Sequence, residues 1–219
     1  MRVMSAVTAA LPTPVGELTI TCTASGVARV RIGPGTAGPG TAGPATAGPA
    51  TTSSWPAGTG PADRAPADIA RQPAGDEASS PGSLLAAAIG QLTEYFAGLR
   101  RAFDLPLDWG RMPPVHRRVL GELYRSVGYG ETLSYGALAS RAGVASGRGD
   151  LPARVVGQAM GANPIPIIIP CHRVVASNGL GGYSGGTGPE VKRWLLIFEG
   201  AWPPVLDWDP AGLPAAQPP

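Results

Sequence analysis

Cysteine, histidine and aromatic residues are scarce in this sequence, and each scarcity excludes a class of protein. The 219 residues include two cysteines and two histidines, and 6% are aromatic. Two cysteines provide no disulfide framework and no paired spacing typical of a zinc ribbon. No apolar run has membrane-spanning length, and no charged segment followed by a long apolar run opens the chain. We therefore expect a protein of the cytoplasm, where a thiol stays reduced, without membrane contact or an export signal.

Charge of either sign is also sparse, at 15% of residues with a net charge of +2. This balance alone does not indicate a nucleic-acid partner. The distribution is more informative, because arginine exceeds acidic residues between positions 111 and 154. The arginines of this stretch are Arg111, Arg117, Arg118, Arg125, Arg141, Arg148 and Arg154. Such an excess can face phosphates, and a solvated surface explains it equally well on charge alone.

Glycine and proline, by contrast, are abundant, with 32 and 25 residues. From Gly33 the chain repeats Gly-Pro-Gly-Thr-Ala and continues into Ser/Pro/Ala/Gly-rich sequence as far as Gly82. This composition buries too little apolar surface to offset the entropy of ordering. Residues 33–82 are therefore predicted to be a disordered insertion. Glycine does not recur at every third position, which excludes collagen.

The remaining pattern predicts an α+β fold, with a reduced β-rich amino-terminal region and a mostly helical carboxy-terminal domain. We expect an amino-terminal domain over 1–110, a second domain over 111–200, and a Pro-rich tail over 201–219. Within the first domain, residues 14–32 alternate as a β-hairpin turning at Ser25-Gly26. A helix over 83–101, capped by Ser83, has a stripe that we interpret as core packing. The stripe consists of Leu84, Leu85, Ala88, Leu92, Tyr95, Phe96 and Leu99.

Three shorter helices are predicted in the second domain. The first runs from Val115 to Val127 behind Pro114. The second and third run over 135–141, capped by Ser134, and over 153–161 behind Pro152. The last two form a predicted helix-turn-helix with a long connection.

The segment Asn163–Val175 carries the candidate chemistry, because it places Cys171 and His172 side by side. Its isoleucines at 167–169 favour a short buried strand, whereas the prolines around them argue against a regular central one. The Asn163 side chain can bridge backbone groups and hold this loop. A thiolate is the reactive form of cysteine, so a base must take the proton. Neighbouring side chains of an extended segment point apart, so a direct Cys171–His172 bond needs a turn; otherwise a water bridges them.

Several motifs resemble the O6-alkylguanine-DNA alkyltransferase family. They are Pro170-Cys-His-Arg-Val174 after Asn163-Pro, Tyr183-Ser-Gly-Gly186, and Lys192-Arg-Trp-Leu-Leu196. The resemblance implies DNA repair by stoichiometric, single-turnover transfer of the alkyl group from O6-alkylguanine to the protein's own cysteine. O4-alkylthymine is left open as a second substrate. The implied partner is double-stranded DNA containing the lesion, and the implied state is a monomer without an obligate protein partner.

The resemblance also implies roles for individual residues. Cys171 is the alkyl acceptor, His172 its base and Glu199 the carboxylate that orients the histidine. Tyr135 hydrogen-bonds the extruded base and the DNA, and Asn163 supports the cysteine loop. In the helix over 153–161, the small residues Ala153 and Gly157 fit the minor groove, and Arg154 fills the gap left by the extruded nucleotide. Pocket walls are assigned to Met160, Val174, Tyr183 and Ser184.

Two other functions remain open at this point. A Cys-His hydrolase could use Cys171 and His172, although no oxyanion-hole motif is evident. A non-catalytic sensor of alkylated DNA is the other, although relatives of that kind lack the reactive cysteine. We expect no cofactor and no metal, because the available ligand types are Cys22, His116 and the pair already assigned.

Overall fold

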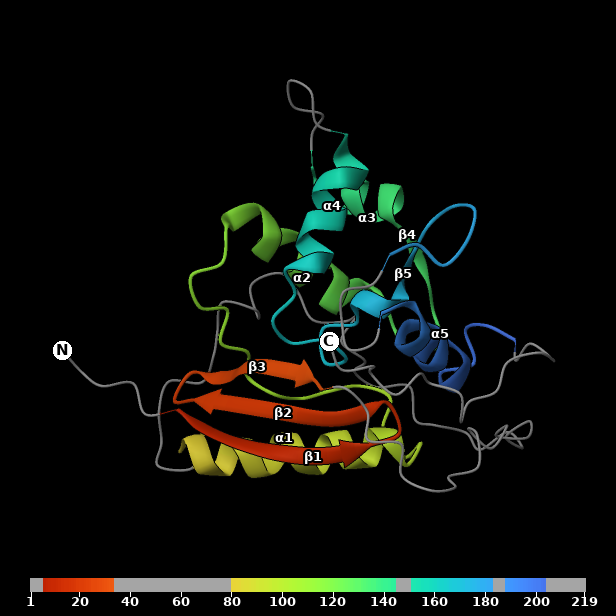
Figure 1. Cartoon of the computed structure of the whole chain (residues 1–219). Helices are drawn as coiled ribbons and strands as arrows, with labels where there is room; N and C mark the ends of the chain where they lie inside the picture. Colours follow the sequence, from red (N-terminus) through yellow and green to blue (C-terminus); the bar gives the residue numbers. More distant parts are fainter. Residues whose placement is uncertain (1–5, 34–79, 145–150, 183–187, 204–219) are drawn as a thin grey trace, which may run out of the picture.

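The computed structural model describes residues 6–33, 80–144, 151–182 and 188–203. The predicted insertion therefore lies almost entirely outside the described residues, and so do Tyr183, Ser184 and the tail beyond residue 203. The described part is an α+β arrangement, as predicted. Three strands and one long helix form a lower layer, and the remaining helices stand above it (Figure 1).

The lower layer is a three-stranded antiparallel sheet in the order β1-β2-β3, with α1 across one face (Figure 1). Its strands are β1 (Val7–Thr13), β2 (Gly16–Thr23) and β3 (Gly26–Ile32). The predicted hairpin corresponds to β2 and β3, which bury Leu18, Ile20 and Cys22 of β2 in the core. The hairpin prediction missed β1. That strand is alanine-rich, contains Pro12 and has no fully buried residue, and it pairs only with β2 at the sheet edge, where proline is tolerated.

Helix α1 (Pro81–Phe96) starts earlier and ends earlier than the predicted helix over 83–101. Its cap is Ser80, whose hydroxyl accepts a hydrogen bond from the Ser83 amide at 3.1 Å. The assignment of Ser83 as the cap was wrong because Pro81 occupies the first helical position, where its missing N–H is not needed. At the other end Gly98 adopts a φ of +74°, which ends the helix and leaves Leu99 82% exposed.

The connector after α1 closes the free edge of β3. Val27 donates its N–H to the Pro106 carbonyl at 2.8 Å, and Asp108 donates to the Val27 carbonyl at 2.9 Å. Gly26 makes this approach possible, because its φ is +135° and a Cβ there would overlap the Pro106 carbonyl. Val30 of β3 also donates its N–H to the Pro164 carbonyl at 2.9 Å, so the sheet is joined to the carboxy-terminal half by a backbone hydrogen bond as well as by a shared core.

The upper layer consists of α2 (Pro114–Ser126), α3 (Tyr135–Arg141), α4 (Pro152–Gly161) and α5 (Pro189–Phe198). It also contains two short parallel strands, β4 (Leu133–Ser134) and β5 (Val174–Val175). The Ser134 hydroxyl caps α3 as predicted, accepting from the Ala137 amide at 3.1 Å. Helices α3 and α4 pack against each other. The connection between them, 145–150, lies outside the described residues, so the helix-turn-helix stays a prediction.

No helix in the described ranges is long and apolar enough to cross a membrane.

Candidate active site

The cysteine loop between α4 and β5 is a compact turn and not the short strand that its isoleucines favoured. Ile167 adopts a φ of +74°, which is strained for a β-branched residue and incompatible with a strand. Asn163 holds the loop from inside: its Oδ1 accepts from the Ile165 amide at 3.0 Å, and its Nδ2 donates to the Ile169 carbonyl at 2.9 Å. These two hydrogen bonds fix the backbone of the loop that carries Cys171.

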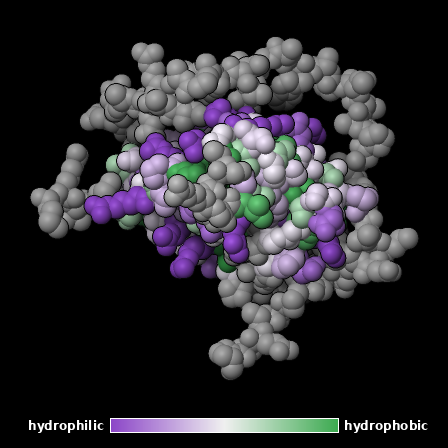
Figure 2. Space-filling model, turned by 90° about the horizontal axis from the view of Figure 1, so that it is seen from above, coloured by the Kyte–Doolittle hydropathy of each residue, from purple (hydrophilic) through white to green (hydrophobic). Residues whose placement is uncertain are grey.

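Cys171 lies on the wall of a cavity of about 860 Å³ and is itself 5% exposed. The cavity brings together residues from α3, α4, the cysteine loop and the segment before the undescribed 183–187. Its lining consists of Ser134, Tyr135, Gly136, Ala153, Arg154, Gly157, Met160, Gly161, Cys171, Ala176, Ser177 and Gly182. Six of the predicted site residues are among them. Viewed from the α4 end, hydrophobic residues occupy the middle of the face and hydrophilic residues its edge (Figure 2).

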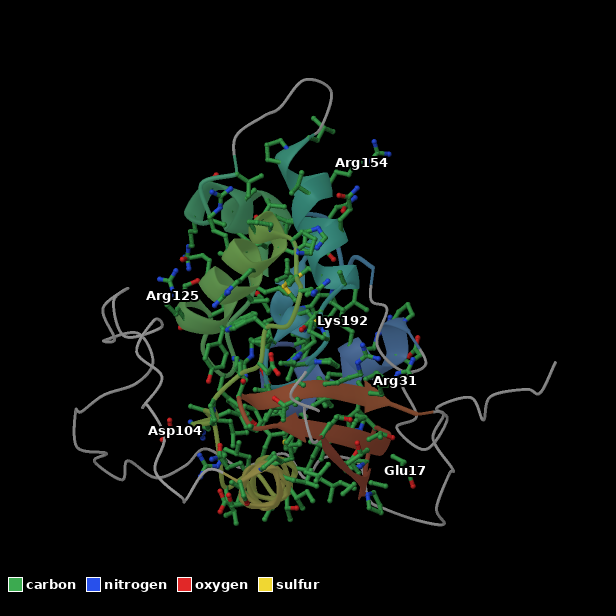
Figure 3. All side chains as sticks on the ribbon, turned by 90° about the vertical axis from the view of Figure 1, so that its left-hand side faces the viewer. Glu17, Arg31, Asp104, Arg125, Arg154 and Lys192 are labelled. Carbon is green, nitrogen blue, oxygen red and sulfur yellow. The ribbon has the colours of Figure 1, made fainter. Side chains whose placement is uncertain are left out.

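Of two further residues assigned to the site, Arg154 lines this cavity and Val174 does not. Arg154 is exposed and projects outward from α4 at the end of the molecule (Figure 3). Val174 is fully buried and does not line the cavity, so its predicted role as a pocket wall is not supported by its position. Its carbonyl instead accepts a hydrogen bond from Lys192 Nζ at 2.6 Å.

Behind the cysteine, a buried array of side chains converges on Glu199. His172 Nε2 lies 2.9 Å from Glu199 Oε1, and the side chains of both residues are fully buried. Arg173 binds the same carboxylate in a bidentate manner, through Nε to Oε2 at 2.8 Å and through Nη2 to Oε1 at 2.9 Å. The Tyr95 hydroxyl donates to Oε1 at 2.7 Å. A short 3₁₀ turn over Cys171–Arg173 sends these consecutive residues in different directions.

The protonation states in the array follow from its contacts. Burial alone would raise the pKa of Glu199. The hydrogen bonds from His172 and Arg173, the charge of Arg173 and the charge that His172 carries when it is protonated at acidic pH outweigh burial and hold that pKa well below its usual range. Burial lowers the pKa of His172, and the opposing effect of Glu199 does not restore it. Glu199 is therefore ionised and His172 neutral at neutral pH. In this state Nε2 carries the proton that is donated to Glu199, and Nδ1 carries the lone pair.

His172 Nδ1 is buried and has no hydrogen-bond partner among the described residues. The turn that a direct bond to Cys171 requires is present, yet no direct bond from Nδ1 to the thiol forms. The other arrangement that the sequence left open, in which a water bridges the pair, stays a prediction.

Lys192 of α5 is a second ionisable group buried beside the cavity. Figure 3 shows it in the interior, and its Nζ donates to the carbonyls of Val174 at 2.6 Å and Gly182 at 3.1 Å. Nζ also lies 5.8 Å from the centre of the Tyr135 ring. Burial lowers the pKa of Lys192 to about 8 against the opposing effect of Cys171. Burial, followed by the nearby Cys171, raises the pKa of Tyr135, whose hydroxyl donates to Gly182 at 3.2 Å.

Sequence reasoning missed three members of this site: Tyr95, Arg173 and Lys192. Arg173 was treated only as a member of the Pro-Cys-His-Arg motif, and Tyr95 only as a member of an apolar stripe. A tyrosine at a buried helix position carries a signal of its own, because its hydroxyl needs a partner. Lys192 likewise indicates a hydrogen-bonding partner, because it lies between buried Val191 and Trp194 and an ammonium group is rarely buried unpaired.

Comparisons with known proteins identify the family of the chain. Residues 114–201 match the family model described as 6-O-methylguanine DNA methyltransferase, DNA binding domain. The methylated-DNA–protein-cysteine methyltransferase of Mus musculus is 49% identical over 102 residues, which are 46% of this chain and 42% of the mouse protein. The DNA base-flipping protein of Thermus thermophilus is 43% identical over 134 residues, which are 60% of this chain and 83% of that protein.

Solved structures extend the likeness across most of the chain. The O6-methylguanine methyltransferase of Mycobacterium tuberculosis is 32% identical, with a TM-score of 0.58, covering 91% of this chain and 96% of that one. A structure of Mycobacterium tuberculosis OGT in complex with DNA has the same identity and TM-score, covering 88% and 91%. Fold and site together define an α+β protein with a cysteine–histidine–glutamate array behind a cavity. The chain belongs to the O6-methylguanine-DNA methyltransferase family, although its match spans less than half the length of the mouse relative.

Proposed function

We propose that this protein repairs DNA by moving an alkyl group from O6 of guanine to Sγ of Cys171, once per molecule. The observation that carries the proposal is Cys171 on the cavity wall, with the hydrogen-bonded pair of His172 and Glu199 buried behind it. The names of the curated relatives support the reaction, and the DNA complex of the tuberculosis protein supports duplex DNA as the partner. The protein acts as a monomer in the cytoplasm, where the thiol stays reduced.

The alkylated oxygen of guanine is hidden inside a duplex, so the nucleotide must first leave the base stack. Helix α4 is the element that approaches the minor groove, because Ala153 and Gly157 give it a narrow surface beside the cavity. Arg154, exposed on the same helix, takes the place of the extruded nucleotide. Residues 111–200 therefore both bind the DNA and carry the reacting thiol.

Alkyl transfer then proceeds as a displacement at the alkyl carbon. His172 Nδ1 accepts the thiol proton through a bridging water, and Glu199 stabilises the imidazolium that forms. The thiolate of Cys171 attacks the alkyl carbon while the bond from that carbon to O6 breaks. The electron pair stays on the departing guanine, which takes up one proton from solvent and leaves as neutral guanine, while His172 gives the thiol proton back to solvent. The Tyr135 hydroxyl leaves Gly182 to hydrogen-bond the extruded base and so stabilises the developing charge.

The test is a mass measurement after mixing the protein with a duplex that contains one O6-methylguanine. We expect one added methyl group on the peptide that carries Cys171, with the base restored to guanine. Cys171→Ala should abolish transfer, whereas Cys22→Ala is the matched control, because Cys22 is buried in β2 and outside the cavity. Transfer that survives in Cys171→Ala would contradict the proposal. A parallel duplex with O4-methylthymine decides whether thymine is a second substrate.

A second function is favoured by one observation, the 43% identity to a protein named as a DNA base-flipping protein. In that reading the chain would extrude and hold the alkylated nucleotide without repairing it. The same experiment separates the two, because a pure binder retains the duplex while no methyl group moves to Cys171.

A further inference from the structure

Tyr95 connects the amino-terminal half of the protein to the catalytic array. It lies near the end of α1, before the first residue of the matched family model, and it is completely buried. Its hydroxyl donates to Glu199 Oε1 at 2.7 Å across 104 residues of sequence. The buried face of α1 otherwise consists of Leu84, Ala88 and Leu92, so the helix contributes one polar group to the array.

Tyr95 is held in this place by the rings around it. Its ring centre lies 5.4 Å from that of Phe103, 5.5 Å from that of Phe198 and 6.2 Å from that of Tyr129. Most of these pairs are edge-to-face, an arrangement that fixes ring orientation. The hydroxyl therefore has little freedom to turn to another acceptor.

The oxygen that accepts from Tyr95 is also the one that faces His172. Glu199 Oε1 accepts from Tyr95, from Arg173 Nη2 and, in the protonation state described above, from His172 Nε2. Three donors from three directions fix the rotation of the carboxylate. Glu199 Oε2 is bound by Arg173 Nε at 2.8 Å and, at 3.5 Å, by the Gly130 amide.

We infer that Tyr95 is a positioning residue for alkyl transfer: its hydroxyl holds Glu199 so that His172 keeps Nδ1 available to the thiol of Cys171. This inference rests on the proposed function. It makes α1 part of the chemistry, although every residue that lines the cavity comes from the carboxy-terminal half.

The expected effect on pH dependence follows from the groups that face His172. These are Lys192 from α5 and Glu199 directly after it, Arg173 and Cys171 from the same turn as His172, and Tyr95, through Glu199, from α1. Removing the Tyr95 hydroxyl takes one donor away from the carboxylate, which then interacts more strongly with a protonated His172. The base should therefore take up its proton at a higher pH, and the acid limb of the rate profile should move to higher pH.

The experiment compares Tyr95→Phe with Tyr129→Phe in the full-length protein. Tyr129 belongs to the same aromatic cluster, but its hydroxyl donates to the Phe198 carbonyl at 3.2 Å, so it is the matched control. Single-turnover methyl transfer is measured from pH 5 to 9, together with thermal unfolding and affinity for the duplex. In Tyr95→Phe we expect transfer about tenfold slower at neutral pH, typical of losing a group that orients a histidine through its partner. The acid limb of its pH–rate profile should move to higher pH, and its affinity for DNA should not change. Tyr129→Phe should follow the wild-type pH–rate profile.

A double-mutant cycle and a spectroscopic signal make the test independent of the rate alone. On a Glu199→Gln background, Tyr95→Phe should cause no further loss of rate, because its effect passes through Glu199. The chain has two histidines, so the ring nitrogens of His172 can be assigned in ¹⁵N NMR spectra against His172→Gln. Wild-type protein should show one tautomer, protonated at Nε2, and Tyr95→Phe a mixture.

Three outcomes would overturn the inference while leaving the proposed function intact. The first is a Tyr95→Phe profile that superimposes on an active wild type. The second is an equal loss of transfer rate in Tyr95→Phe and Tyr129→Phe without a shift of the pH–rate profile, which would mean that Tyr95 only packs in the core. The third is additive loss on the Glu199→Gln background. Failure of the wild type to transfer methyl groups would instead refute the proposed function itself.

Discussion

The sharpest test of the buried array is Glu199→Gln, which removes its negative charge and leaves its shape. Arg173 is 6% exposed and depends on this carboxylate for two of its hydrogen bonds. The substitution therefore leaves a guanidinium charge buried without a counter-charge. Breaking a buried pair in this way costs about 3–5 kcal/mol. At about 2–4 °C per kcal/mol for a protein of this size, the unfolding temperature should fall by roughly 6–20 °C.

A compensating variant separates stability from catalysis. Glu199→Gln combined with Arg173→Met removes both charges, and neutral replacements of buried pairs are often tolerated. The Val127 carbonyl loses its bond to Arg173 Nη1 (2.8 Å), so stability should return to within about 1–3 kcal/mol of wild type. Alkyl transfer should stay slow in both variants, because His172 has lost its carboxylate partner in each.

Thermal unfolding and single-turnover transfer at neutral pH measure the two effects. Glu94→Gln is the matched control, since Glu94 pairs with Arg100 at 2.6 Å while its side chain is 49% exposed. Surface pairs of that kind contribute at most about 1 kcal/mol. The reasoning is wrong if Glu199→Gln unfolds within a degree or two of wild type, or if the double variant regains transfer.

Three further predictions test the support of the site. Gly26→Ala should destabilise the protein by about 2–4 kcal/mol in urea unfolding, because its φ is +135° and the new Cβ meets the Pro106 carbonyl; an unchanged midpoint would contradict this. Asn163→Ala removes both side-chain bonds inside the cysteine loop and should cost about 1–3 kcal/mol and slow transfer, while affinity for the duplex, measured by titration, stays the same. The pKa of His172 is lowered by burial, so between an unfolded value near ~6.5 and the lower folded value the unfolded chain binds more protons. Stability should therefore fall as the pH drops below about 6.5, and His172→Gln should remove this part of the pH dependence of stability. A wild-type protein that gains stability over the same pH range would refute the lowered pKa of His172.

The helical framework of the upper layer was predictable because its signals are local. Pro114 and Pro152 stand at first helical positions, and the Ser134 hydroxyl caps α3. Each of these signals acts within one turn of a helix, so neighbouring residues suffice to read it. The hairpin of β2 and β3 belongs to the same class, since alternation and a two-residue turn are local as well.

Elements stabilised by distant partners were the ones that the sequence left out or placed wrongly. Strand β1 has weak strand propensity and exists through its pairing with β2. The isoleucines at 167–169 have high strand propensity, yet the two hydrogen bonds of Asn163 close them into a turn. Tertiary contacts outweighed propensity in both places.

The sequence by itself determined the chemistry that is available: one cysteine in a Pro-Cys-His-Arg motif, a nearby histidine and a carboxylate at position 199. The tertiary structure decided which groups act together. It placed Tyr95 and Arg173 on the same carboxylate as His172, and it buried Lys192 between two carbonyls. The physical reason is that a buried polar group takes its partner from whatever the fold brings within about 3 Å, and sequence spacing carries no record of that distance.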